Sequence, residues 1–366
     1  MGHEETENVA KAFSSNWIST KGPFIDKFEK GLAKYCDRTN VCVVQSGTAA
    51  IHLAIKILGI SEGDTVLCQS FTFVGSCNPV IYEKANLIFV DSEKETWNMC
   101  PNSLRKALED CKKRKIMPKA VIVVHLYGMP AKMNEILFVA NEYKVAVIED
   151  AAEALGSKLN KKPCGSFGRL SILSFNGNKI ITTSGGGALL SNNKDEINEA
   201  NFLSTQAKEN KPFYEHKRSG YNYKLSNILA SIGVAQLKVL DERVKQRRKN
   251  HLFYYNLLKN IRGITFLSEP KGYFSNRWLT CILIDKKTCG LTIDQIISDF
   301  ESENIETRRL WKPMHMQPLF KKNLFYGNGV SDLLFENGIC LPSGSDMDNS
   351  DRKRIKEKLT KIFSIK

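Results

Sequence analysis

Short apolar runs alternate with longer amphipathic segments between about residue 25 and residue 240, and this alternation limits the fold more than any other feature. Several runs are apolar throughout, as expected for strands that are covered on both faces. The seven predicted strands cover residues 41–46, 65–70, 87–91, 120–126, 145–150, 170–175 and 187–191. Helices are predicted between them over residues 48–59, 102–113, 131–143 and 193–207. The pattern predicts an α/β fold with a mostly parallel sheet and helices on both of its faces.

The chain changes character after a long helix that is predicted over residues 225–259. Beyond it, the predicted elements are a strand and two helices, over residues 277–285, 293–303 and 351–363. A chain of 366 residues is long enough for two domains. We therefore expect a large α/β domain over residues 1–244 and a smaller α+β domain over residues 245–366.

The formal net charge of +14 raises the question of nucleic-acid binding. The basic residues are spread along the chain, with short clusters at residues 111–115, 243–250 and 351–358. Leu240, Val244 and Leu252 recur at helical spacing, which makes the second cluster the solvated face of an amphipathic helix. No base-reading motif is found, so nucleic acid is not an expected partner. Attraction to an anionic small molecule, such as a nucleotide, explains the basic excess equally well.

The sequence lacks the signals of a secreted, membrane-spanning or metal-binding protein. No apolar run approaches the roughly 18 residues needed to cross a bilayer, and the N-terminal stretch has no apolar segment typical of a secretory signal. The ten cysteines include no CxxC pair and no Cys/His cluster at metal-ligand spacing. These features predict a cytoplasmic protein with reduced thiols, no metal site and no membrane span.

In parallel sheets ligands bind beyond the carboxyl ends of the strands, so the residues that follow each strand are the candidates. After the first strand, Gly47 permits a tight turn and Thr48 opens a helix, whose N-terminal N–H groups can hold a phosphate. A plain N-cap at Ser46 or Thr48 explains the same residues. After the second strand, Phe71 and Phe73 share one face if the chain is extended. Such an aromatic can stack on a planar ring or belong to the core.

Three carboxylates lie together after the fifth strand: Glu149, Asp150 and Glu153. A strand alternates faces, so one of the adjacent pair can point into a cleft. A carboxylate buried there needs a cation or a protonated ring nitrogen as its partner. The alternative is an N-cap at Asp150 for a helix that starts at Ala151.

Lys179 follows the sixth strand and lies among apolar residues, with Ser174 five positions before it. A mostly apolar cleft favours the neutral, nucleophilic lysine amine that forms a Schiff base. The alternative is a surface lysine at a turn. Successive strand ends thus offer a phosphate cradle, a stacking aromatic, a carboxylate and a Schiff-base lysine. A protein must supply these four functions to hold pyridoxal 5'-phosphate (PLP) and use it as an electron sink.

Several stretches carry a resemblance to one family, and they span nearly the whole chain. They are "SGTAAIHLAI", "SFTFVGS", "VHLYGMP", "IEDAAEALGS", "SFNGNKIITTSGGGAL", "GYNYKLSNILASIGVAQLKVLDERV" and "IETRRLWKPMH". In them the chain resembles the PLP-dependent sugar aminotransferases of the DegT/DnrJ/EryC1/StrS family. The resemblance implies a fold type I PLP-dependent transferase, like aspartate aminotransferase, with a large sheet domain and a smaller C-terminal domain.

The resemblance also implies roles for individual residues. Lys179 is expected to bond the cofactor, Asp150 to pair with its pyridine nitrogen, and Phe73 to stack on its ring. Glu153 is expected near the ring oxygen of the cofactor. The expected phosphate ligands within the subunit are Gly47, Thr48 and Ser174. Asn222 is expected to reach the phosphate of the neighbouring subunit, which implies a homodimer with shared active sites.

Residues 204–223 resemble the branch that acts on UDP-linked 4-keto-6-deoxy-N-acetylglucosamine, with members in the bacillosamine and legionaminic acid pathways. L-glutamate is the expected amino donor. Arg277, Arg308 and His315 are candidate substrate ligands, although each is also explained as a surface residue of the small domain. A related branch has histidine in place of the lysine and dehydrates sugars, so Lys179 favours transamination. The alternatives are a dTDP- or GDP-linked substrate and a non-catalytic, PLP-binding regulatory protein.

Overall fold

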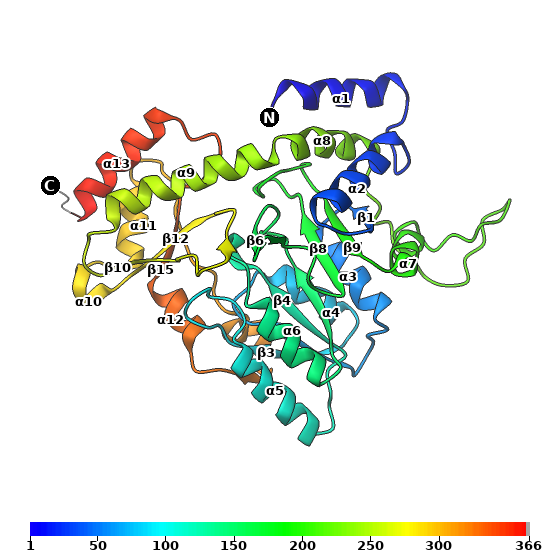
Figure 1. Ribbon diagram of the computed structural model, residues 1–366, viewed down its shortest axis with the longest axis horizontal. Coiled ribbons are helices and arrows are strands. Elements are labelled where there is room, and N and C mark those ends of the chain that lie inside the picture. Colours follow the sequence, from blue (N-terminus) through cyan, green and yellow to red (C-terminus); the bar gives the residue numbers. More distant parts are fainter. Residues whose placement is uncertain (364–366) are drawn as a thin grey trace.

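The seven predicted strands all form, and they lie in one sheet of the computed structural model, which describes residues 1–363 (Figure 1). The eight strands follow in spatial order as β1 (Asn40–Val44), β9 (Gly187–Ser191), β8 (Leu170–Ser174), β5 (Ala146–Asp150), β4 (Ala120–Val124), β2 (Thr65–Gln69), β3 (Asn86–Val90) and β14 (Phe325–Tyr326). Strand β9 is antiparallel to both of its neighbours, and the other pairs are parallel. The prediction of a mostly parallel sheet is therefore confirmed.

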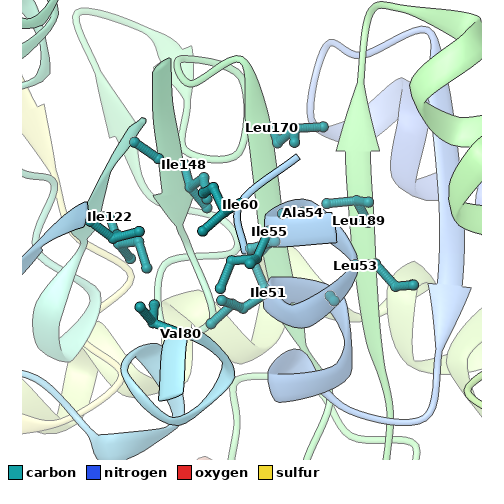
Figure 2. Close-up of a cluster of buried hydrophobic side chains, with 14 of the residues drawn as sticks. Ile51, Leu53, Ala54, Ile55, Ile60, Val80, Ile122, Ile148, Leu170 and Leu189 are labelled. Atoms are coloured by element: carbon teal, nitrogen blue, oxygen red, sulfur yellow. The ribbon is translucent and has the colours of Figure 1, made fainter. Parts of the chain in front are cut away.

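Helices cover both faces of this large sheet. One face packs against α3 (Gly47–Ile57), α4 (Asn78–Tyr82) and α7 (Lys194–Ser204). The other face packs against α2 (Pro23–Tyr35), α5 (Pro101–Lys113), α6 (Met133–Glu142) and α8 (Asn227–Lys238), while α1 (His3–Ser14) packs on α8. Figure 2 shows Ile51 and Ile55 of α3 against Ile122 and Ile148 of the sheet. This packing fixes the start of α3 relative to the strand ends.

The single helix predicted over residues 225–259 is two helices, α8 and α9 (Leu240–Leu258), separated at Val239. The break lets α8 pack on α1 and α2 while α9 continues to the second sheet. Leu240 and Val244 are buried as expected, but Leu252 is 55% exposed. At 100° per residue Leu252 lies about 120° around the helix from Leu240, so it cannot share the buried face. That face carries Arg247 and Tyr254 instead.

The C-terminal half builds a four-stranded antiparallel sheet. In spatial order its strands are β10 (Ile264–Phe266), β12 (Thr280–Ile284), β15 (Gly338–Leu341) and β13 (Arg308–Arg309). The accompanying helices are α10 (Lys286–Cys289), α11 (Ile293–Glu301), α12 (Val330–Asn337) and α13 (Asn349–Phe363). Within residues 1–363, no helix combines the length and the apolar composition needed for a membrane span.

Two strand pairings join the C-terminal half to the large sheet domain. Strand β14 adds to the edge of the large sheet beside β3. Strand β11 (Tyr273–Phe274) pairs with the hairpin of β6 (Lys158–Leu159) and β7 (Lys162–Pro163). Helix α9 crosses the predicted boundary between residues 244 and 245 without a break. That boundary stays a prediction.

Candidate active site

The carboxyl ends of β2, β5 and β8 meet the start of α3 at a cavity of about 270 Å³, which we call the active-site cavity. The predicted residues that line it are Gly47, Thr48, Phe73, Asp150, Glu153, Ser174 and Lys179. They come from separate stretches of the chain, and the parallel sheet brings the stretches to one edge. The residues predicted at separate strand ends therefore lie at one place in the molecule.

Helix α3 presents the N–H groups of its first turn to this cavity. Ser46 is the N-cap, since its Oγ accepts a hydrogen bond from the Ala49 N–H at 3.0 Å. Gly47 and Thr48 stand in the first turn, where N–H groups have no acceptor within the helix. A Cβ on Gly47 would lie 3.2 Å from the Cβ of Ser174, so glycine lets the helix start lie close to this serine. The N–H groups and the two hydroxyls form a site suited to an anion.

Asp150 lies buried at the floor of the cavity. Its carboxylate accepts hydrogen bonds from the Ser76 hydroxyl at 2.7 Å and from the Ala152 N–H at 3.1 Å. No helix starts at Ala151, because residues 152–156 form turns, and so the alternative of a helix N-cap at Asp150 is wrong. Two neutral donors compensate a buried carboxylate only in part, which leaves it suited to a cationic partner.

Glu149, the neighbour of Asp150, points to the other side of β5 and is fully buried. It accepts hydrogen bonds from the His125 imidazole at 2.9 Å, the Gly168 N–H at 2.9 Å and the Ser171 hydroxyl at 2.8 Å. Burial by itself would raise the pKa of Glu149, but these hydrogen bonds outweigh it and lower the pKa to about 2. Glu149 therefore holds the sheet together as a charged, well-compensated group.

His125, Glu149 and Cys164 place potential ligand atoms within 4.8 Å of one another, an arrangement that invites a metal. The Nδ1 of His125, however, accepts a hydrogen bond from the Ala131 N–H at 2.9 Å. Its Nε2 then carries the proton that is donated to Glu149. The imidazole has no lone pair left for a metal ion, so this group is structural.

Lys179 lies in the loop after β8, with its amine close to a second carboxyl group. Its Nζ is 3.4 Å from the Glu153 Oε1 and 4.2 Å from the centroid of the Trp278 ring. Glu153 also accepts the Tyr127 N–H at 2.6 Å. Burial raises the pKa of Glu153 to about 7, and the charge of Asp150 adds to this effect, while Lys179 and the Tyr127 N–H oppose it. A carboxyl that titrates near neutral pH thus lies beside the amine.

The two phenylalanines after β2 do not share a face. The chain turns after Gln69, so the extended geometry assumed for them is absent. Phe71 is fully buried and belongs to the core, whereas Phe73 is 57% exposed and borders the cavity. The ring of Phe73 lies 5.4 Å from that of Trp311, centroid to centroid. Phe73 is the aromatic residue at this strand end that is available to cover a planar ligand.

Arg277 was predicted to contact substrate, but the structure places it away from the active-site cavity. Its guanidinium donates to the Leu267 carbonyl at 2.6 Å and pairs with Glu269 at 3.6 Å. It borders a different cavity, beside α9. The tertiary packing of β10 and β12, which the sequence pattern does not show, directs this side chain inward.

His315 and Arg308 also lie outside the active-site cavity. The two ring nitrogens of His315 are engaged by the Ser70 hydroxyl at 2.7 Å and by Asp332 at 2.9 Å. Arg308 is exposed on β13, where it pairs with Glu306 and borders a neighbouring cavity. Of the predicted substrate ligands, only Arg308 lies beside a cavity that adjoins the active site.

Asn222 is exposed, and its own subunit's cavity is lined by other residues. Its backbone forms a single bridge with Thr205, at the base of the segment between α7 and α8. That segment extends away from the body of the molecule (Figure 1). The position is compatible with a contact to a second subunit.

The residues lining the cavity that sequence reasoning missed include Ser76, Asn178, Trp278 and Trp311. Ser76 lies inside the stretch "SFTFVGS". Its hydroxyl follows that of Thr72 by four residues, and this spacing is the sequence feature that could have indicated it. The tryptophans belong to the C-terminal half and reach the cavity only through packing. No local pattern in the sequence connects them with Lys179.

The residues in the cavity fit a phosphorylated pyridine aldehyde. The start of α3 with Thr48 and Ser174 suits the phosphate, Asp150 a protonated ring nitrogen, and Lys179 an aldehyde carbon. A Cβ on Gly75 would lie 3.2 Å from the Thr48 Oγ1, so glycine keeps this hydroxyl accessible. The fold and the cavity together define the class of PLP-dependent transferases of fold type I.

The chain belongs to the DegT/DnrJ/EryC1/StrS aminotransferase family, whose model matches residues 1–360. EpsN of Bacillus subtilis (strain 168), which carries the name of a pyridoxal phosphate-dependent aminotransferase, is 50% identical over 99% of this chain and 94% of its own. GDP-perosamine synthase of Escherichia coli O157:H7 is 35% identical over 99% of this chain and 96% of its own.

Among solved structures, a DegT DnrJ EryC1 StrS aminotransferase from Brucella abortus matches with a TM-score of 0.91 and 26% identity. The match covers 98% of this chain and 95% of that one. These findings confirm the family, the fold and the cofactor expected from the sequence. The chain is a PLP-dependent sugar aminotransferase.

Proposed function

We propose that the enzyme transfers an amino group from L-glutamate to C4 of a UDP-linked 4-keto-6-deoxy-N-acetylhexosamine. The product would be the UDP-linked 4-amino-4,6-dideoxy-N-acetylglucosamine, with an equatorial amine. The observation that carries the reaction type is the Lys179 amine 3.4 Å from the Glu153 carboxyl in the active-site cavity. The sugar and its nucleotide rest on the resemblance of residues 204–223 to the UDP-sugar branch.

Bound PLP supplies the electron sink for the carbanion that transamination requires. Lys179 is the residue that removes and returns the proton, first on the amino acid and then on the sugar. One amine can serve both steps because it acts alternately as base and as acid. Glu153, which titrates near pH 7, lies next to this amine and can hold a proton or give one up during the cycle.

The remaining residues of the cavity hold the cofactor in place. Asp150, whose carboxylate is fixed by Ser76, would pair with the pyridine nitrogen and keep it protonated. The N–H groups of Gly47 and Thr48 and the Ser174 hydroxyl bind the phosphate. Phe73, which borders the cavity, would stack on the ring. Each role is assigned from position in the cavity and from the family resemblance together.

The enzyme is proposed to act as a homodimer in the cytoplasm. Asn222 of each subunit would contact the phosphate in the other subunit, so that both sites are shared. All ten cysteines are unpaired, which suits a reducing compartment. The split into domains at residues 1–244 and 245–366 is part of the same proposal.

A GDP-linked sugar is the second candidate substrate, because GDP-perosamine synthases are 33–35% identical to this chain over nearly its full length. The purified, PLP-loaded enzyme should be incubated with glutamate and with UDP-, GDP- or dTDP-linked 4-keto sugars or a dTDP-linked 3-keto sugar, and the products identified by NMR. We expect turnover of the UDP-linked N-acetyl sugar at a kcat/KM at least tenfold above the others. A preference for a dTDP-linked 3-keto sugar would overturn both candidates and leave the general aminotransferase activity.

A further inference from the structure

A second cavity, of about 360 Å³, adjoins the active-site cavity. The two share three lining residues: Asn178, Trp278 and Trp311. Helix α9, strand β13 and the turn that follows β15 form its other walls. A substrate whose reacting carbon lies at Lys179 can therefore extend past the tryptophans into this space, which we call the side cavity.

Arg247 is the buried cation of the side cavity. It stands on the inner face of α9 and is only 8% exposed. Its Nη1 donates to the Trp278 carbonyl at 2.5 Å, while its buried Nε has no hydrogen-bond partner. Within residues 1–363, no carboxylate lies within 4 Å of this guanidinium. Burial lowers the pKa of Arg247 to about 10, although the charge of Asp346 opposes the effect.

The guanidinium of Arg247 still has one edge free to bind an anion. With Nη1 occupied, the edge formed by Nε and Nη2 remains, and this edge binds two oxygens of one anion side by side. A buried, unpaired guanidinium is costly, so the folded chain keeps it at a loss of stability until a partner arrives. The arrangement is typical of a ligand-binding group more than of a structural ion pair.

A second polar group of the side cavity is also without a partner. The Thr307 Oγ1 is buried and has no hydrogen-bond partner among the described residues. Arg308, next in the chain, borders the same cavity. The opposite wall is held in place by Asn250, whose side chain donates to the Gly344 carbonyl at 2.7 Å. Glu306, which pairs with Arg308, also lines the cavity. The cavity thus offers a fixed guanidinium edge and a hydroxyl to a ligand, while the charge of Arg308 is already paired.

We propose that Arg247 and Thr307 bind an anionic oxygen group of a substrate while its reacting carbon lies at Lys179. This inference rests on the proposed function and identifies a subsite of the same active site. Two substrates carry the required chemistry: the carboxylates of the amino donor and the diphosphate of the nucleotide sugar. Both present paired anionic oxygens that match the free edge of an arginine.

The proposal is tested by measuring, with calorimetry, how tightly 2-oxoglutarate and UDP each bind to the PLP-loaded enzyme. Arg247→Gln should weaken binding of at least one probe by tenfold or more, and Arg247→Lys by less. Loss for 2-oxoglutarate assigns the subsite to the amino donor, and loss for UDP assigns it to the diphosphate. Arg248→Gln is the matched control, since its neighbouring guanidinium pairs with Glu269 outside both cavities.

Thr307→Val keeps the shape of the side chain and removes the hydroxyl. This variant tests the same subsite if Arg247→Gln does not fold. It should weaken binding of the same probe by roughly tenfold to a hundredfold, in line with one hydrogen bond to a charged group. Binding of both probes within twofold of wild type in a folded Arg247 variant and in Thr307→Val would overturn the inference. The probes need no sugar turnover, so an enzyme that binds them yet converts no keto sugar refutes the proposed function alone.

Discussion

Adjacent residues of β5 take opposite roles because side chains alternate across a strand. Asp150 faces the active-site cavity with two neutral donors, whereas Glu149 faces the sheet interior with a full set of hydrogen bonds. The two carboxylates are chemically alike, so their difference lies in what surrounds them. Substitutions that remove only the charge should therefore affect catalysis at Asp150 and folding stability at Glu149.

Asp150→Asn should lower kcat on the order of 10² to 10⁴-fold, because the carboxamide cannot keep the pyridine nitrogen protonated. Glu149→Gln should instead lower the free energy of unfolding by about 3 kcal/mol, since it disturbs a buried charge and its donors. Steady-state kinetics and urea unfolding of both variants give the comparison. If the folded Glu149→Gln enzyme lost turnover and Asp150→Asn kept it, the assignment of faces on β5 would be wrong.

Lys179→Ala should abolish both transamination and the visible absorbance that a covalently bound cofactor gives. The far-ultraviolet circular dichroism should stay unchanged, because the side chain lies in a loop and carries no core packing. Lys84→Ala is the control, since Lys84 is exposed and forms a surface pair with Glu62. Near-normal turnover of the Lys179 variant would refute the proposed role.

The raised pKa of Glu153 makes stability depend on pH. Between its ordinary pKa of 4.5 and the folded-state value of about 7, the folded chain keeps a proton that the unfolded chain has released. The free energy of unfolding contributed by this group therefore falls as pH rises through that window, by an amount on the order of 3 kcal/mol. Glu153→Gln removes the contribution.

Urea unfolding of the cofactor-free protein at pH 5 and pH 7.5 measures this effect. We expect wild type to lose stability relative to Glu153→Gln between the two pH values, while the contributions of other groups cancel in the difference. Parallel behaviour of the two proteins would show that Glu153 titrates normally.

At the scale of elements, the contact between α3 and β9 sets the position of the phosphate site. A Cβ on Gly187 of β9 would lie 2.5 Å from the Gly47 nitrogen, so the strand and the helix start touch through backbone atoms. Gly187→Ala should push the helix start away, weaken cofactor binding at least tenfold and destabilise the fold by about 1–3 kcal/mol. Titration of the cofactor-free protein with PLP, followed by absorbance, gives the dissociation constant.

Gly177→Ala is the matched control for this change. A Cβ there would approach its nearest neighbour, the Ser184 carbonyl, at 4.0 Å, which is an ordinary contact. Cofactor affinity should stay within twofold of wild type. Equal weakening in both variants would mean that loss of glycine, and not the contact with α3, is responsible.

The large sheet could be predicted from sequence because several of its buried strands are continuous apolar runs and the others are mostly apolar. Strands β13 and β14 are only two residues long, which is too short for any periodicity to show. The buried face of α9 was also misjudged. Arg247 occupies a position that the helical pattern assigns to an apolar residue, and it lines the side cavity there instead of the apolar core.

At the scale of the whole molecule, the segment between α7 and α8 is the part that reaches outward (Figure 1). Phe213 and Tyr214 are 58% and 81% exposed on it, which is unusual for large aromatic side chains. Together with Asn222, these residues give the segment an apolar and a polar group suited to a second subunit.

We expect inactive Lys179→Ala and Asn222→Ala subunits to regain activity when they are mixed under conditions that allow subunit exchange. If Asn222 serves the opposite subunit, a mixed dimer contains one site with both residues intact. Recovery should approach a quarter of wild-type activity per subunit in an equal mixture. Sedimentation measures the dimer, and absence of recovery in a proven mixed dimer would place the action of Asn222 within its own subunit.

The candidate site could be predicted only where it follows strands of the large sheet. Lys179 and Asp150 were found because a parallel sheet brings its carboxyl ends together. Trp278 and Trp311 belong to the C-terminal half and lie about 100 or more residues after Lys179 in the chain. Their positions depend on how the small sheet packs against the large one, and no local pattern records that.

The eighth strand of the large sheet is also the last to leave the ribosome. Until residues 325–326 emerge, β3 has an open edge, and buried Asp91 lacks the N–H groups of Asn328, Val330 and Ser331 that compensate its charge. An unpaired sheet edge is a template for association with other chains. An incomplete chain therefore exposes this edge and this carboxylate until nearly the whole chain has been synthesised, and we expect truncation before residue 325 to favour aggregation over a stable large domain.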